Sequence, residues 1–85
     1  MTTKGQIVVY GTTWCPDCTR SKRLLDRRQT PYSWVNIEED PQAVALVVQL
    51  NRGMRIVPTI VFPDGTVLAE PSDRVLAGKL ESLGR

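Results

Sequence analysis

Two cysteines, Cys15 and Cys18, are the residues of this chain best suited to chemistry, and they stand in the segment Cys15-Pro16-Asp17-Cys18. The apolar, β-branched run Ile7–Tyr10 precedes them and is typical of a short buried strand. Pro16 suits the first turn of a helix, because its missing N–H would have no partner there. The pattern predicts that a helix starts at this motif, with Cys15 as its N-cap.

The predicted helix start makes the two thiols unequal. An N-cap thiolate faces unpaired backbone N–H groups and the positive end of the helix dipole, and thiols in such motifs have a pKa lowered from about 8.5 to roughly 3.5–7.5. Cys18 lies one turn on, where it can attack a mixed disulfide formed at Cys15. Asp17 should offset part of this effect, because a carboxylate disfavours a nearby thiolate. We therefore expect a reactive dithiol with Cys15 as the nucleophile.

Two other uses of such a pair fit this chain less well. Structural zinc normally needs four ligands, and the sequence has 2 Cys and no His, so a self-contained zinc site lacks ligands. A purely structural disulfide would close so short a loop that it would stabilise the fold little. A reactive pair at a strand-to-helix turn is the better interpretation.

The composition is that of one small globular domain spanning residues 1–85. The sequence is 41% apolar and 24% charged, and no apolar stretch is long enough to span a bilayer. A net charge of +2 is too small to indicate nucleic-acid binding. The segment Met1–Gln6 is short and polar, without the apolar core of a secretory signal, so we expect a cytoplasmic location. We also expect the protein to be a monomer. In the cytoplasm a dithiol is more often catalytic than structural.

Caps, turns and apolar periodicity predict the elements that position the dithiol. In chain order we expect a strand at Ile7–Tyr10, a helix at Pro16–Arg28, a strand at Tyr32–Ile37, a helix at Pro41–Leu50, hairpin strands at Val57–Phe62 and Thr66–Leu68, and a last helix capped by Ser72. A strand, helix and strand in series imply a parallel crossover, whereas hairpin strands are antiparallel. The sequence thus predicts an α/β fold of order βαβαββα, with a mixed four-stranded sheet and helices on both faces.

One of the three expected helices has competing signals, and the other two have faces whose environment can be predicted. The segment Val44–Val48 is rich in β-branched residues, but the Asp40-Pro41 cap before it and Gly53 after it favour a helix. In the last helix we expect one buried side formed by Val75, Leu76, Leu80 and Leu83. On the first helix we expect a solvated outer face, or a surface that steers acidic partners, formed by Arg20, Lys22, Arg23, Arg27 and Arg28.

With this order of elements, the motif Cys15-Pro16-x-Cys18-x-Arg20-x-Lys22 and the later Val57-Pro58-Thr59 resemble a small glutaredoxin of the thioredoxin superfamily. The resemblance covers essentially the whole chain. It implies a thioredoxin-like fold and an enzyme that exchanges thiols and disulfides, without a tightly bound cofactor or metal. It also implies that Pro58 follows a cis peptide bond beside the dithiol, and that the Val57 backbone binds the incoming substrate like an added strand.

Departures from the glutathione-using pattern favour another small thiol. Thr12 stands where those members usually carry a basic residue, and Glu70-Pro71 replaces their Gly-Gly pair, which weakens both anchors for glutathione carboxylates. Ser72-Asp73 keeps the family pattern and could meet a polar or cationic group or cap a helix. These departures resemble the mycoredoxin branch, which takes electrons from mycothiol, a thiol built on a sugar and inositol. Trp14, shared with that branch, could shield the dithiol, face a partner or pack on its loop.

Three related functions are therefore open. The first is reduction of mixed disulfides between proteins and a small thiol, with mycothiol favoured over glutathione. The second is a thioredoxin-like electron donor to ribonucleotide reductase that a flavoprotein recycles, although the segment such donors carry near the last helix is replaced here by Glu70–Arg74. The third is an iron–sulfur cluster carrier bridged by two chains, against which Pro16 speaks because such members tend to have a smaller residue there.

Overall fold

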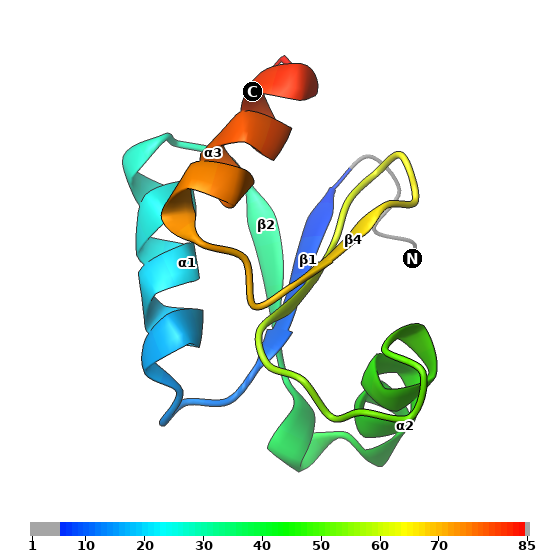
Figure 1. Ribbon diagram of the computed structural model, residues 1–85. Coiled ribbons are helices and arrows are strands. Elements are labelled where there is room, and N and C mark those ends of the chain that lie inside the picture. The colour runs from blue at the N-terminus through cyan, green and yellow to red at the C-terminus, as the bar shows by residue number, and fades with distance from the viewer. Residues whose placement is uncertain (1–5, 85) are drawn as a thin grey trace.

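The computed structural model describes residues 6–84 (Figure 1). Its elements are β1 (Ile7–Gly11), α1 (Pro16–Arg27), β2 (Tyr32–Asn36), the 3₁₀ helix η1 (Ile37–Glu39), α2 (Pro41–Leu50), β3 (Thr59–Val61), β4 (Val67–Ala69) and α3 (Asp73–Ser82). Apart from η1, this is the predicted order. The N-terminal segment on which the expected location depends lies outside the described residues, except for Gln6. Within residues 6–84, no helix has both the length and the apolar character that crossing a bilayer requires.

A four-stranded sheet forms the centre of the fold, in the order β2-β1-β3-β4. β1 is parallel to β2, and β3 is antiparallel to both β1 and β4. Val9 of β1 is thus paired with Trp34 on one side and with Ile60 on the other. The mixed sheet predicted from the sequence is confirmed.

Helices cover both faces of this sheet, as expected, with α1 and α3 on one face and α2 on the other (Figure 1). Side chains of a strand alternate between its two faces, so each face of the sheet needs its own apolar layer. The layer under α1 and α3 consists of Ile7, Val9, Leu24, Leu25, Ile60, Phe62, Leu76 and Leu80. The smaller layer under α2 consists of Ile37, Ala43 and Val47, with Tyr10, Val35, Val44 and Val57 packed against it.

α2 forms in spite of its β-branched residues. The Asp40 carboxylate accepts the backbone N–H groups of Gln42 (3.1 Å) and Ala43 (3.2 Å), and Pro41 occupies the first turn. Ala43 and Val47 then bury their side chains in the smaller apolar layer. The cap and tertiary burial together outweigh local strand propensity, because propensity differences between such residues are only tenths of a kcal/mol, about 0.7 at most.

All four strands differ from their expected bounds. β1 runs one residue further, to Gly11, and β3 ends one residue earlier, at Val61. β2 ends at Asn36, because the Asn36 side chain accepts the Glu38 N–H (3.1 Å) and turns Ile37 into η1. β3 begins at Thr59 rather than Val57, because Pro58 has no N–H to give to the sheet. β4 is shifted by one residue along the chain, to Val67–Ala69.

The predicted buried side of α3 was wrong at one position. Leu76 and Leu80 are fully buried and Leu83 packs against them, but Val75 remains 51% exposed. The inward stripe follows the spacing i, i+4 and i+7 from Leu76, which leaves the preceding residue on the flank of the helix.

Candidate active site

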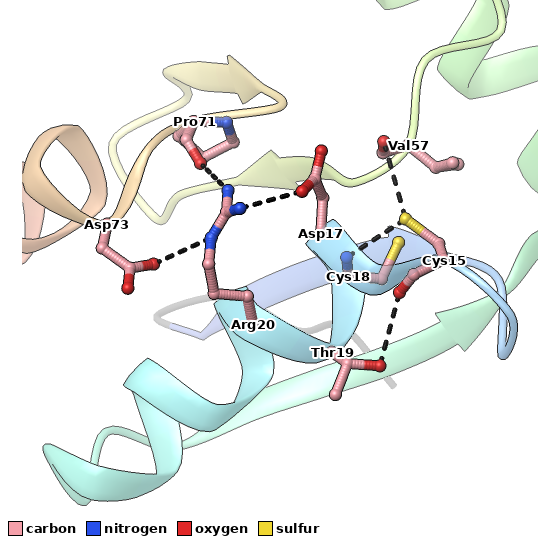
Figure 2. Close-up of polar contacts among 8 residues, drawn as sticks. All are labelled: Cys15, Asp17, Cys18, Thr19, Arg20, Val57, Pro71 and Asp73. Carbon is pink, nitrogen blue, oxygen red and sulfur yellow. Dashed lines mark hydrogen bonds and ion pairs between the residues drawn. The ribbon is translucent and has the colours of Figure 1, made fainter.

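Cys15 is the N-cap of α1, as predicted. Its Sγ accepts the backbone N–H of Cys18 at 3.1 Å, and its carbonyl oxygen accepts the Thr19 hydroxyl at 3.3 Å (Figure 2). The Thr19 N–H also donates to this carbonyl, at 3.1 Å. The same sulfur lies 3.9 Å from the carbonyl oxygen of Val57. A sulfur at this position receives an N–H bond and the helix dipole together, and both stabilise negative charge on it.

Cys18 lies one turn deeper and has no exposed surface, whereas Cys15 keeps 6% of its surface. Burial raises the pKa of the Cys18 thiol to about 12, helped by its hydrogen bond to Cys15 and the charge there, while the Thr12 backbone and Lys22 act in the opposite direction. Both cysteines are free thiols. At neutral pH Cys18 is therefore a protonated thiol, and it lies next to the Cys15 sulfur at the N-terminus of α1.

Gly11, at the end of β1, gives the Cys18 sulfur its space. A Cβ on Gly11 would lie 2.5 Å from Cys18 Sγ and 2.9 Å from the Trp34 ring. Lys22 caps the same ring, with its Nζ 3.6 Å from the Trp34 centroid. Sequence reasoning missed both Gly11 and Trp34; the available signal was a glycine ending a strand directly before a reactive motif, which marks a close approach.

The segment that carries Val57 and Pro58 closes the other side of the dithiol. The Val57–Pro58 peptide bond is cis, as the resemblance implied. The Pro58 carbonyl accepts the Glu70 N–H at 2.8 Å, and the Thr59 hydroxyl donates to the Ile56 carbonyl at 2.7 Å. These bonds fix the loop, so the sequence-predicted residues Val57 and Pro58 do lie beside Cys15.

Arg20 joins the start of α1 to the start of α3. Its guanidinium bonds to Asp17 (2.8 Å), to Asp73 (3.2 Å) and to the carbonyl oxygen of Pro71 (3.2 Å), as Figure 2 shows. Asp17 therefore faces a cation on its own helix, which reduces the repulsion expected between its carboxylate and the neighbouring thiolate. Ser72 caps α3, with its hydroxyl accepting the Val75 N–H at 3.2 Å.

The expected solvated basic face on α1 was only partly right. Arg20 forms the contacts above, Lys22 covers Trp34, and Arg28 lies 3.7 Å from Glu81. Arg23 and Arg27 are exposed, as predicted. The role of Arg20 was missed because one partner, Asp73, is far away in the sequence; the Asp17–Arg20 spacing of three residues was a visible signal.

Trp14 does not pack on its own loop. Its ring is 66% exposed, and its indole N–H donates to Glu38 at 2.9 Å. Glu38 and Arg55 also line a hollow of about 460 Å³ whose floor includes Ile37, Pro41 and Val44. The exposed apolar ring thus stands directly before Cys15 in the chain and is held by Glu38.

The positions that would anchor glutathione carboxylates in a glutathione-using member lack the groups that could bind them. Thr12 is 2% exposed, and its hydroxyl has no hydrogen-bond partner among residues 6–84. Glu70 is exposed in a left-handed conformation (φ 48°), and the buried Pro71 gives its carbonyl to Arg20. Neither position presents a cation or a pair of free N–H groups at the surface.

A mixed sheet of this order with a dithiol at the start of the first helix defines a class, the thiol–disulfide oxidoreductases of thioredoxin-like fold. The family model described as Glutaredoxin matches residues 7–68. The chain belongs to the glutaredoxin family.

Known relatives agree with this assignment. A Mycobacterium tuberculosis protein named "Putative glutaredoxin" is 38% identical over 74 residues, covering 87% of this chain and 88% of that protein. Mycoredoxin 1 of Corynebacterium glutamicum is 34% identical over 79 residues, covering 93% and 98%. The crystal structure of a glutaredoxin from Archaeoglobus fulgidus superposes with a TM-score of 0.73 at 24% identity, covering 95% of this chain and 87% of that one, which shows the shared fold.

Proposed function

We propose that this chain reduces mixed disulfides between proteins and mycothiol, with Cys15 as the attacking sulfur. Glutaredoxins act on mixed disulfides with a small thiol as co-substrate. The observation that carries the proposal is the position of Cys15 Sγ at the N-cap of α1, where it accepts the Cys18 N–H at 3.1 Å. A thiolate, not a thiol, is the nucleophile in disulfide exchange, and this position favours the thiolate.

The reaction begins when the Cys15 thiolate attacks the mycothiol sulfur of the mixed disulfide. The old S–S bond breaks, the protein thiolate leaves and takes up a proton, and mycothiol remains on Cys15. In a monothiol route a second mycothiol attacks this adduct and leaves as mycothiol disulfide. In a dithiol route Cys18 attacks instead, which releases mycothiol and forms a Cys15–Cys18 disulfide that two further mycothiols reduce. Both routes have the same net reaction: the mixed disulfide and one free mycothiol give the protein thiol and mycothiol disulfide, and Cys15 is regenerated as a thiolate.

Substrate orientation is assigned to the loop of Val57 and Pro58. The Val57 carbonyl lies 3.9 Å from Cys15 Sγ, so the extended backbone of a protein whose mixed disulfide approaches that sulfur would pass along Val57. Hydrogen bonds between the main chain of Val57 and the substrate backbone would resemble the addition of a strand to the exposed edge of a sheet. They recognise a backbone rather than a side chain, which suits an enzyme that meets many protein disulfides.

Mycothiol is favoured over glutathione by the surroundings of the site. The buried Thr12 cannot reach a carboxylate of the ligand. Pro71 has no N–H to donate to such a carboxylate, and the negative charge of the exposed Glu70 would repel it. Mycothiol lacks the end carboxylates that glutathione carries. The similarity to a relative named Mycoredoxin 1 supports the same choice. Because the reaction draws on a reduced thiol pool, we place it in the cytoplasm.

Two single substitutions test the route. In Cys15→Ser no activity on a mycothiolated protein should remain, because the attacking sulfur is gone. In Cys18→Ser much of the activity should remain, because the monothiol route needs only Cys15. The measurement is release of mycothiol from a mycothiolated test protein with mycothiol as reductant. Complete loss in both variants would remove the monothiol route, and full activity in Cys15→Ser would remove the proposal.

The same assay separates this function from that of an electron donor served by a flavoprotein. Mycothiol should support turnover, whereas thioredoxin reductase with NADPH should not. Turnover with the reductase alone would assign the chain to the second class.

A further inference from the structure

Three charged side chains form one wall of the candidate active site. Asp17 in the first turn of α1 and Asp73 in the first turn of α3 share the guanidinium of Arg20, at 2.8 Å and 3.2 Å. We call these three residues the charge cluster. All are between 41% and 46% exposed, so they face solvent as well as one another.

The cluster carries a net negative charge next to the reacting sulfur. It contains two carboxylates and one guanidinium, and the guanidinium is turned toward Asp17, Asp73 and the Pro71 carbonyl rather than outward. Glu70 and Arg74, exposed nearby in the sequence, carry opposite charges. Figure 2 shows Asp17 between the dithiol and Arg20, and Val57 facing the Cys15 sulfur on the side away from Arg20. A group attached to Cys15 therefore lies between an uncharged backbone edge and a negative wall.

We propose that the charge cluster determines which small thiols Cys15 accepts: it favours disulfides whose small-thiol part is neutral or cationic and disfavours those with a carboxylate near the reacting sulfur. Arg20 is the positioning residue, because it sets the net charge of the two carboxylates and holds them at the site. This inference rests on the proposed function for the reaction at Cys15, and it extends that function to the charge class of the thiol.

The size of the effect follows from Coulomb's law. Unit charges on the order of 7 Å apart in water change a rate about threefold. A cationic and an anionic probe respond in opposite directions, so one unit of charge in the cluster should change their rate ratio by about five- to tenfold. Because the cluster is solvent-exposed, about 0.5 M salt should remove most of this change.

The test uses three small symmetric disulfides: cationic cystamine, neutral hydroxyethyl disulfide and anionic dithiodiglycolate. Their second-order rate constants with the reduced chain are measured by the mass of the Cys15 adduct over time. Arg20→Met should raise the ratio of the cystamine rate to the dithiodiglycolate rate about five- to tenfold. The pair Asp17→Asn with Asp73→Asn should lower it by at least about tenfold, because the cluster then becomes positive.

Arg23→Met is the matched control, because it removes the same charge from an exposed residue of α1 that has no ion pair within residues 6–84. Its ratio should stay within about twofold of the original. A structural defect would change the rate constants of all three disulfides in the same direction. A change of charge in the cluster would instead change the rate constants of the cationic and anionic disulfides in opposite directions. If Arg20→Met does not fold, Asp73→Asn alone still tests the proposal, because removing one negative charge should lower the ratio of the cystamine rate to the dithiodiglycolate rate.

Unchanged ratios in the cluster variants, or ratios that move in the same direction in variants of opposite charge, would overturn this inference and leave the oxidoreductase intact. Failure of the original chain to react even with the neutral disulfide would instead overturn the proposed function.

Discussion

Cys15 and Cys18 are the same kind of residue one helical turn apart, yet the fold gives them different chemistry. One sulfur ends at the open N-terminus of α1 and accepts an N–H bond. The other is fully buried, against Gly11 and Trp34. Burial raises the pKa of the Cys18 thiol to about 12, so near neutral pH this thiol is protonated.

Alkylation at different pH values checks this difference. The Cys18 pKa lies above its ordinary value, so its reactive thiolate should be scarce near neutral pH and should increase about tenfold per pH unit up to about 12. Iodoacetamide followed by peptide mass mapping should label Cys15 first near neutral pH. Comparable labelling of Cys18 at that pH in the folded chain would contradict the assignment.

The sequence was sufficient to predict that Cys15 is the N-cap of α1 and that Cys18 lies one turn on. Those features are local: a strand-like run, a cysteine, then proline at the first helical position. Arg20 and Trp34 were not predicted as parts of the site, because their partners are Asp73 on the last helix and Gly11 on the first strand. Contacts between distant segments leave no local pattern to read.

At the scale of elements, the junction between β1 and α1 places the dithiol. Gly11 ends the strand where any Cβ would meet the Cys18 sulfur at 2.5 Å. The close packing holds Cys18 directly behind Cys15. The chain can make this approach only at a residue without a side chain.

We therefore predict that Gly11→Ala destabilises the chain by about 1–3 kcal/mol, because overpacking forces Cys18 or Trp34 to move. The measurement is the free energy of unfolding in urea. Gly78→Ala is the matched control: Gly78 lies within α3 with no atom near its would-be Cβ, so the same change should stabilise by about 0.5–1 kcal/mol. Equal effects at both positions would refute the packing argument.

The N-cap of α2 is the second test at this scale. Asp40 accepts two backbone N–H groups ahead of a run of valines that would otherwise suit a strand. Asp40→Ala should therefore cost about 1 kcal/mol of stability in the same urea experiment. Asp40→Asn keeps an acceptor and should cost less; a larger loss for Asn than for Ala would show that the cap is not what the position provides.

The elements were predicted better than their ends. Proline and aspartate caps, glycine stops and apolar stripes were enough to predict α1, α2 and α3, but not the short helix η1. The start of β3 was misplaced because Pro58 has no N–H to donate to the sheet. The end of β2 was misplaced because the Asn36 side chain accepts the Glu38 N–H. The pattern of apolar residues reveals neither effect.

At the scale of the whole molecule, the order of elements was enough to predict the mixed sheet and its two covered faces. Both apolar layers are closed by the chain's own helices. Among the described residues, four large apolar side chains remain exposed: Trp14 before α1, Leu50 at the end of α2, Met54 after α2 and Val75 on α3. Apolar residues exposed singly on a surface need no partner to cover them.

We accordingly propose that the chain acts alone, as one domain. Sedimentation should give a mass near 9.5 kDa at every concentration. Repeating the run after anaerobic treatment with iron and sulfide tests the cluster-carrier alternative, which requires two chains. A coloured species of twice the mass would favour that alternative.

The central claim is that Cys15 takes up the small thiol, and the mass of its adduct tests this most directly. Reduced Cys18→Ser chain is mixed in separate tubes with mycothiol disulfide and glutathione disulfide, quenched with acid, and mapped by peptide mass. We predict one mycothiol on the peptide that carries Cys15, formed faster than the glutathione adduct. No adduct at Cys15, or an adduct with glutathione alone, would contradict the account.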